Sequence, residues 1–228
     1  MAKAPDNSEN TGESSQDLRV KVIEMIMSLR TAGIRDTKVL AAIERVPRHL
    51  FVNAAFLQRA YSDIALPIEC GQTISQPYIV AYMSELLKIS DRHKVLEVGT
   101  GSGYQAAVLS HLARRVYTIE RYRTLGKDAD ARFAELHLSN ITAMIGDGTE
   151  GWPTKMDFDR IIVTAAAAEI PKPLLDQLRP DGIMVIPVGV AGGIQHVVRA
   201  TRVGDELKFE KFHEVRFVPL VPGKAQQL

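Results

Sequence analysis

Residues 97–103 form a glycine-rich segment whose spacing suits a nucleoside cofactor. The segment has the pattern Glu-x-Gly-x-Gly-x-Gly, and its glycines allow a tight turn and a close approach between main chain and ligand. In the dinucleotide fingerprint Gly-x-Gly-x-x-Gly the third glycine comes one place later. A carboxylate at Glu97 would repel a pyrophosphate but would favour a cationic amino group. S-adenosylmethionine has an ammonium, a sulfonium and no phosphate, so it is the expected cofactor. The residues expected to bind it here are Glu97, Gly99, Thr100, Gly101, Ser102 and Gly103.

Two further acidic residues follow apolar runs and could hold the rest of a nucleoside. Glu120 ends the run 116–120, where a carboxylate can accept hydrogen bonds from both ribose hydroxyls. Asp147 lies in a Gly-Asp-Gly turn, where it could accept a hydrogen bond from the adenine amine. Each feature alone is more often a solvated strand end or a plain turn. Their order after successive strands favours a cofactor site that includes Glu120, Asp147 and Gly148.

The segments that carry these residues alternate between strand and helix patterns. Short runs rich in valine and isoleucine predict buried strands at 94–98, 116–120, 141–145, 159–164 and 182–188. Helices are predicted at 104–113, 124–136 and 173–178, and further strands at 195–203, 207–209 and 214–218. Such alternation is typical of a doubly wound α/β fold, which binds ligands at the carboxyl ends of its strands. We therefore expect a mostly parallel, Rossmann-like sheet of the S-adenosylmethionine-dependent methyltransferase type, with an N-terminal helical addition.

The region before the first predicted strand has a different pattern. Residues 1–17 are polar and are expected to form a disordered tail. Apolar residues recur at helical spacing over 18–29, and shorter helices are expected around 39–43, 51–61 and 79–87. The expected organisation is one domain over 18–228. Its first part, 18–90, is helical and carries an active-site loop, and its second part, 91–228, is the α/β core with the C-terminal strands.

Bulk composition limits the partners of the chain. A net charge of +1 over 228 residues gives no basic field for a nucleic-acid backbone. No apolar run approaches the ~20 residues that span a bilayer, and the N-terminus lacks a signal sequence. A single cysteine, Cys70, favours a reducing compartment, and the histidines lack metal-ligand spacing. A cytoplasmic monomer with no metal, nucleic-acid or membrane partner is expected.

Several motifs over about residues 18–221 resemble the protein-L-isoaspartate O-methyltransferase family. They are Val46-Pro47-Arg48, Gly71-Gln72-Thr73-Ile74-Ser75-Gln76-Pro77, the glycine loop, Ile161–Ala166, Pro187-Val188-Gly189 and Arg216–Leu220. The loop around Thr73 is the specific one, because many methyltransferases share the glycine loop. The resemblance implies methyl transfer to the free α-carboxylate of L-isoaspartyl residues in damaged proteins and peptides. It implies that Ser75 is catalytic and that Gln72, Thr73 and Ile74 also bind the cofactor. The substrate would then be bound by Thr73, Ser75, Thr164, Ala165 and Val188.

The implied reaction makes modest chemical demands. A carboxyl group with a pKa of about 3.3–4 is already ionised at neutral pH, so no general base is needed. The enzyme has to desolvate the carboxylate and aim one oxygen at the methyl group. Ser75 is therefore expected to position the substrate and not to attack it. The local pattern alone favours a Ser75 hydroxyl that bonds its own backbone. Only the resemblance of the surrounding loop favours a role for Ser75 in positioning the substrate. The methyl ester then lets the next backbone nitrogen close a succinimide, which hydrolyses partly to aspartate.

Three other functions fit parts of the sequence. A methyltransferase for a small molecule or RNA would share the cofactor loop. Enzymes that methylate base amines commonly carry Asn/Asp-Pro-Pro-Tyr/Phe after the fourth strand, where this chain has a run of alanines after Thr164. A nicotinamide-dependent oxidoreductase is disfavoured by the glycine spacing. A noncatalytic nucleotide-binding module would leave the loop 73–75 without a role.

Overall fold

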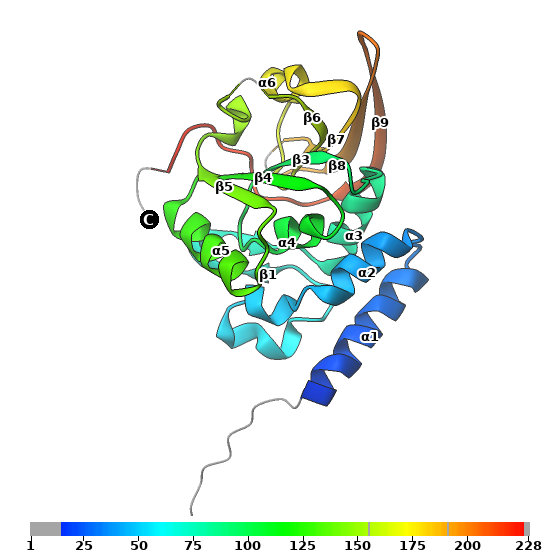
Figure 1. Cartoon of the computed structure of the whole chain (residues 1–228), viewed down its shortest axis with the longest axis vertical. Coiled ribbons are helices and arrows are strands. Elements are labelled where there is room, and N and C mark those ends of the chain that lie inside the picture. The colour runs from blue at the N-terminus through cyan, green and yellow to red at the C-terminus, as the bar shows by residue number, and fades with distance from the viewer. Residues whose placement is uncertain (1–14, 155, 191, 226–228) are drawn as a thin grey trace, which may run out of the picture.

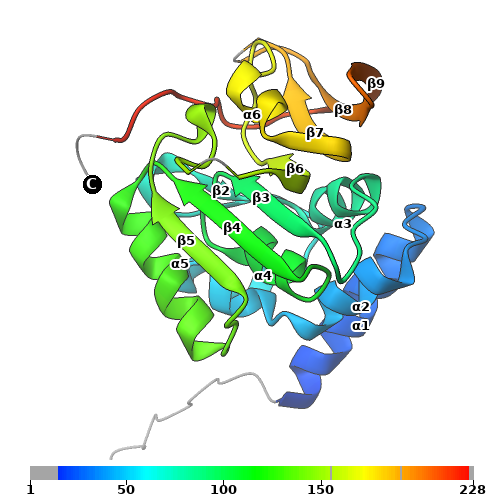
Figure 2. The ribbon, with the colours of Figure 1, turned by 45° about the horizontal axis from the view of Figure 1, so that its top comes forward.

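The computed structural model describes residues 15–154, 156–190 and 192–225. Within them, a seven-stranded sheet has the order β5-β4-β3-β6-β7-β8-β9 and is flanked by helices (Figure 1). Neighbouring strands are parallel from β5 to β7, and β8 and β9 are antiparallel. The hairpin of β8 and β9 lies at the opposite edge of the sheet from β5 (Figure 2). The mostly parallel α/β fold expected from the sequence is confirmed.

The strands lie close to their predicted positions, with differences after residue 177. Their bounds are β3 Lys94–Val98, β4 Arg115–Glu120, β5 Ile141–Ile145, β6 Phe158–Val163, β7 Leu178–Val188, β8 Gln195–Val203 and β9 Glu206–Val215. Strand β7 begins at Leu178, where a helix was expected to end. Strand β9 is one continuous strand, and 216–218 are not part of it. Pairing ends at Val215, and beyond it the Gln195 side-chain amide bonds both the N–H and the carbonyl of Phe217 in place of a partner strand.

Helices of the core and of the N-terminal region enclose the parallel strands. The helices of the core are α4 Tyr104–Ser110, α5 Arg123–Glu135 and α6 Lys172–Asp176, and those of the N-terminal region are α1 Ser15–Thr31, α2 Thr37–Arg45 and α3 Pro77–Leu86. Helix α1 begins three residues before the expected boundary at Leu18, so the prediction of a tail is wrong for 15–17. Residues 1–14 of that predicted tail lie outside the described residues. None of the helices described is long and apolar enough to cross a membrane.

Short 3-10 turns and a two-stranded sheet connect α2 to α3. They are η1 Arg48–Phe51, η2 Ala54–Arg59, β1 Leu66–Pro67, η3 Glu69–Gly71 and β2 Thr73–Ile74, and a further turn, η4 Gly148–Glu150, follows β5. The helix expected at 51–61 is the turn η2, which Asn53 caps by accepting a hydrogen bond from the N–H of Ala55. This region therefore has little regular hydrogen bonding of its own. Its position depends on side chains that reach into it.

The central strands of the sheet, β3, β6 and the second half of β7, are buried on both faces, as their continuous apolar runs require. Val95 and Leu96 of β3 and Val185 and Ile186 of β7 are fully buried. Strand β3 lies between β4 and β6, so the chain leaves β3 towards one side and returns on the other. At such a reversal the loops diverge and leave a crevice at the carboxyl ends of the strands.

Candidate cofactor cleft and substrate groove

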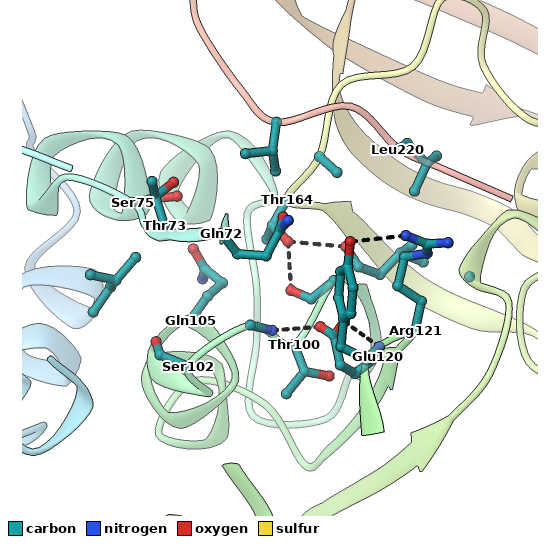
Figure 3. A pocket seen from close by; sticks show the side chains of 18 of the residues that line it. Gln72, Thr73, Ser75, Thr100, Ser102, Gln105, Glu120, Arg121, Thr164 and Leu220 are labelled. Atoms are coloured by element: carbon teal, nitrogen blue, oxygen red, sulfur yellow. Dashed lines mark hydrogen bonds between the residues drawn. The ribbon is translucent and has the colours of Figure 1, made fainter. Parts of the chain in front are cut away.

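A cleft opens at this reversal point (Figure 3). Its walls come from the loop after β3, the end of β4, the loop around β2 and the segment 218–221. Figure 3 shows Thr73 and Ser75 at one end of the cleft and Glu120 and Arg121 at the other. The predicted cofactor residues that line it are Gln72, Thr73, Ile74, Gly99, Thr100, Gly101, Ser102, Glu120 and Gly148. The fold thus brings together residues from four separate segments.

The glycine loop needs its glycines for both backbone angle and space. Gly99 has φ +96° and Gly101 has φ +54°, values that side chains disfavour. A Cβ atom at Gly99 would lie 2.4 Å from the Thr164 hydroxyl oxygen. That hydroxyl lies 2.6 Å from the Gly99 carbonyl oxygen and 3.1 Å from that of Val98, and it can donate to one of them at a time. Thr164, at the end of β6, therefore holds the loop from the other side of β3.

Glu120 is the carboxylate of the cleft. It is almost fully buried, and it accepts hydrogen bonds from the N–H of Gly101 at 2.8 Å and of Tyr122 at 3.0 Å. A carboxylate has about four lone-pair sites, so two remain for further donors. A pair of ribose hydroxyls can use these sites. The backbone bonds fix the direction in which the carboxylate faces the cleft.

Glu97 does not face the cleft, in contrast to the prediction from the sequence. It pairs with Thr118 across β3 and β4, and its side chain is fully buried. The Thr118 hydroxyl donates to Glu97 at 2.5 Å and lies 2.6 Å from the Thr100 hydroxyl. Burial raises the pKa of Glu97 to about 8, so the group is mostly protonated at neutral pH. Because alternation along the strand turns it beneath the loop, Glu97 supports the loop and presents no charge to a ligand.

Three other predicted residues also lie outside the cleft lining. Asp147 accepts hydrogen bonds from the N–H and hydroxyl of Thr149 at 2.9 and 2.6 Å and from the N–H of Gly223 at 2.5 Å. Partial burial opposes its ionisation, but these bonds and nearby Arg121 lower its pKa overall. Asp147 therefore fastens the C-terminal segment, and its contact with the adenine amine stays a prediction. Gly103 avoids a contact at 2.8 Å between a Cβ atom and the Phe133 ring, and Val188 pairs with His196 between β7 and β8.

A second hollow, which we call the groove, adjoins the cleft. Its lining includes Gln76, Tyr78 and Ile79 on one side and 213–218 on the other. The cleft and the groove share four residues, which are Thr73, Ser75, Thr164 and Val218. Ala165 lines only the cleft. A ligand in the groove and a ligand in the cleft would therefore meet beside these four residues.

Ser75 lies at this junction, and its hydroxyl makes no hydrogen bond to another described residue. The residue is half-buried, and its carbonyl accepts a hydrogen bond of 2.8 Å from the Arg48 guanidinium. The local pattern favoured a hydroxyl bonded to its own backbone, and the structure does not contain that bond. The hydroxyl is available to a ligand in either hollow.

Several cleft residues were missed by the sequence analysis. Tyr104, Gln105, Arg121 and Tyr122 line the cleft, as does the segment 218–221. Arg121 lies over the Tyr122 ring, 4.9 Å from its centroid, and donates to the Tyr122 hydroxyl at 3.1 Å. Tyr122 lies two residues beyond Glu120, so its closeness to the predicted strand end could have indicated that it lines the cleft. The segment 218–221 lies about 100 residues further on, and only the fold brings it to the cleft. Among the described residues, no group of three or more His, Cys, Asp or Glu side chains is placed to hold a metal ion.

Comparisons with known proteins identify the family to which this arrangement belongs. The sequence model of protein-L-isoaspartate(D-aspartate) O-methyltransferase (PCMT) matches residues 20–225, which is most of the chain. The chain belongs to the protein-L-isoaspartate O-methyltransferase family. A protein of that name from Parvibaculum lavamentivorans is 63% identical over 207 residues, covering 90% of this chain and 93% of its own. Another from Maricaulis maris is 56% identical over 208 residues, covering 91% and 97%.

Solved structures agree with the fold of this family. A protein-L-isoaspartate O-methyltransferase superposes with a TM-score of 0.80 at 27% identity, over 87% of this chain and 65% of that chain. A putative protein-L-isoaspartate O-methyltransferase from Plasmodium falciparum, in complex with S-adenosyl-L-homocysteine, superposes with a TM-score of 0.76 at 22% identity. It covers 87% of this chain and 97% of its own. The family resemblance expected from the sequence is confirmed by the match over residues 20–225 and by the relatives at 63% and 56% identity.

Proposed function

We propose that the protein transfers a methyl group from S-adenosylmethionine to the free α-carboxylate of L-isoaspartyl residues in damaged proteins and peptides. The observation that carries the proposal is the meeting of cleft and groove at Thr73, Ser75, Thr164 and Val218. Two ligands must react side by side in methyl transfer, and the chain has two hollows that join at one place. Membership of the family, with relatives of that name at 63% and 56% identity, supports the choice of acceptor.

The residues of the cleft fit S-adenosylmethionine. Glu120 offers a fixed carboxylate for ribose hydroxyls, and Gly99 and Gly101 leave the main chain open to close approach. Arg121, the cationic side chain in the lining, is engaged with Tyr122 and with the Gly223 carbonyl. Among the described residues of the lining, no free cation is therefore placed for a phosphate. We assign Gln72, Thr73, Ile74, Thr100, Ser102 and Gly148 to the same site because they line the cleft. When bound, S-adenosylmethionine supplies the methyl group from a cationic sulfur, which keeps the S–C electron pair.

The residues at the junction bind and aim the acceptor carboxylate. Its oxygen forms the new bond to carbon, and it is ionised before it arrives, so no side chain has to remove a proton. Thr73, Ser75, Thr164 and Val218 carry no charge. The hydroxyls of Thr73 and Ser75 can donate to one carboxylate oxygen and leave the other free to attack. A cation at the same place would hold the carboxylate more tightly but would lower its reactivity. In this mechanism Ser75 positions the substrate and forms no covalent bond with it.

The product follows from the chemistry of the ester. Methanol leaves a methyl ester far more readily than hydroxide leaves a carboxyl group, so the next backbone nitrogen can attack the ester carbonyl, displace methanol and close a succinimide. Hydrolysis of the succinimide gives normal aspartate in part, without further help from the protein. The net result is repair of the isomerised peptide bond.

One assay tests the activity and its substrate together. The protein is incubated with labelled S-adenosylmethionine and two peptides that differ only in an aspartyl or isoaspartyl linkage. We expect base-labile methyl groups on the isoaspartyl peptide alone. Equal labelling of both peptides, or labelling of RNA in a parallel reaction, would rule out the proposed acceptor.

The cellular setting is also part of the proposal. We infer a cytoplasmic monomer without nucleic-acid or membrane partners, from the single cysteine and the net charge of +1. Light scattering of the purified protein over a range of concentrations measures the oligomeric state directly. A mass that doubles at micromolar concentration would contradict the monomer.

A further inference from the structure

We propose that Arg48 is a positioning residue for methyl transfer, which fixes the loop that carries Ser75 and ties it to Tyr104 in the wall of the cofactor cleft. Arg48 lies outside both hollows, so it touches neither ligand. The inference rests on the proposed function, because the position of Ser75 matters only if Ser75 aims a substrate.

The Arg48 guanidinium bonds two main-chain carbonyls that are far apart in the sequence. Its Nε donates to the carbonyl of Ala60 at 2.8 Å, and its Nη2 donates to the carbonyl of Ser75 at 2.8 Å. The first carbonyl belongs to the end of η2, and the second belongs to the residue at the junction of cleft and groove. One rigid, planar group thus sets the distance between the helical region and the loop.

The same guanidinium is stacked on the other wall of the cleft. Its central carbon lies 4.7 Å from the centroid of the Tyr104 ring. Tyr104 is the first residue of α4, directly after the glycine loop, and it lines the cofactor cleft. Phe51 holds the Tyr104 ring in an edge-to-face contact at 5.5 Å. Arg48 therefore relates the position of Ser75 to the glycine loop as well as to η2.

Burial of the Arg48 guanidinium costs free energy, which indicates that this side chain does more than fill space. Arg48 is fully buried, and no carboxylate pairs with it among the described residues. Its Nη1 and the Tyr104 hydroxyl are also buried. Among the described residues neither atom makes a hydrogen bond of good geometry, but the two side chains interact, and each favours the charged form of the other. A buried cation held by two carbonyls and a ring is expensive compared with an apolar side chain of similar volume. What an apolar side chain could not do is hold the Ser75 carbonyl.

The Ser75 loop has few other restraints. Strand β2 has two residues, its partner strand β1 also has two, and Ser75 follows immediately after β2. The Ser75 side chain makes no hydrogen bond to a described residue, so the place from which its hydroxyl can reach a ligand follows from the position of the backbone. Loss of the bond to the Ser75 carbonyl would free the next peptide plane to rotate and would displace the hydroxyl. A displacement of about 1 Å at such a place can lower a rate by ~100-fold.

The test uses the full chain with Arg48→Lys, which keeps the charge but cannot bond both carbonyls and stack on Tyr104. We expect kcat on an isoaspartyl peptide to fall by ~10- to 100-fold, while the Kd of S-adenosylhomocysteine stays close to wild type. Arg45→Lys, an exposed position three residues earlier, is the matched control and should behave like wild type. Arg48→Gln gives a second, neutral variant, and thermal unfolding shows whether each variant is folded.

A double-mutant cycle with Ser75→Ala separates positioning from general structural damage. If Arg48 acts through Ser75, the combined variant should be no slower than Ser75→Ala alone. Multiplying effects, or full kcat in Arg48→Lys, would overturn the inference. Failure of both Arg48 variants to fold would also overturn it, because Arg48 would then be needed for folding. Wild-type protein that does not methylate the isoaspartyl peptide would contradict the proposed function itself, and that result is read before any variant is made.

Discussion

The carboxylate of Glu120 accepts a hydrogen bond from the main-chain N–H of Gly101, 2.8 Å away. This bond joins the end of β4 to the glycine loop after β3, so one side chain both shapes the loop and faces the cleft. A second bond, from the N–H of Tyr122, prevents the carboxylate from turning away. The acidic strand end is therefore preorganised for a ligand that presents hydroxyl groups.

Glu120→Ala should weaken cofactor binding. The variant loses a carboxylate that can accept hydrogen bonds from ribose, and each hydrogen bond to a charged group is worth about 1.5–3 kcal/mol. The Kd of S-adenosylhomocysteine, measured by calorimetry, should rise by ~10-fold or more. Asp130→Ala, an exposed carboxylate on α5, serves as the control. An unchanged Kd in Glu120→Ala would show that the carboxylate does not face the nucleoside.

Ser75→Ala should impair turnover more than cofactor binding. The hydroxyl stands at the junction of cleft and groove, so its loss removes one donor to the acceptor carboxylate. We expect kcat on an isoaspartyl peptide to fall by ~10- to 100-fold, which corresponds to one charge-assisted hydrogen bond. The Kd of S-adenosylhomocysteine should change little. Ser139→Ala, at an exposed position outside both hollows, controls for the loss of a hydroxyl, and full activity of Ser75→Ala would contradict the assigned role.

Glu97→Gln should change how stability depends on pH. Burial raises the pKa of Glu97 to about 8 in the folded protein, well above its ordinary value of 4.5. Between these values the unfolded chain releases a proton that the folded chain keeps. The free energy of unfolding should therefore fall as pH rises from about 4.5 to about 8, by at most ~1.4 kcal/mol per pH unit from this group. Below about pH 4.5 the contribution is complete.

Glutamine mimics the protonated acid, so Glu97→Gln should remove this part of the slope. Urea unfolding of the ligand-free wild type and of Glu97→Gln at several pH values gives the slope of the free energy of unfolding against pH for each. Identical slopes would show that Glu97 is ionised in the folded state, as the sequence analysis expected.

Gly99→Ala should destabilise the protein through contact as well as through backbone strain. Gly99 has φ +96°, and a Cβ atom there would meet the Thr164 hydroxyl at 2.4 Å. Gly33 is the matched control, because it has φ +107° and no atom within 4 Å of its Cβ position. Gly33→Ala is therefore destabilised by backbone strain alone. The free energy of unfolding of Gly99→Ala should fall by about 1–3 kcal/mol more than that of Gly33→Ala. Chemical unfolding of both variants gives the difference, and equal losses would mean that Thr164 moves aside without cost.

The order of strands and helices in the α/β core, from β3 to β8, was predicted from the sequence alone. Valine- and isoleucine-rich runs predicted β3 and β5 to the residue, because strands that helices cover are mostly apolar. The glycine spacing and the acidic strand end at Glu120 located the cofactor cleft for a similar reason. Tight turns and strand ends are local features, so local sequence reports them. The loop around Ser75 identified the family through its specific residue pattern.

Side-chain direction and long-range contact were decided only by the tertiary structure. Glu97 and Asp147 follow the expected pattern in the sequence, yet one points beneath the loop and the other fastens Gly223. The groove, the wall at 218–221 and the bond between Arg48 and Ser75 join segments that lie far apart in the chain. Sequence patterns report which residues can turn, pack or ionise. Which of them meet depends on how the elements pack together, and that is a property of the whole fold.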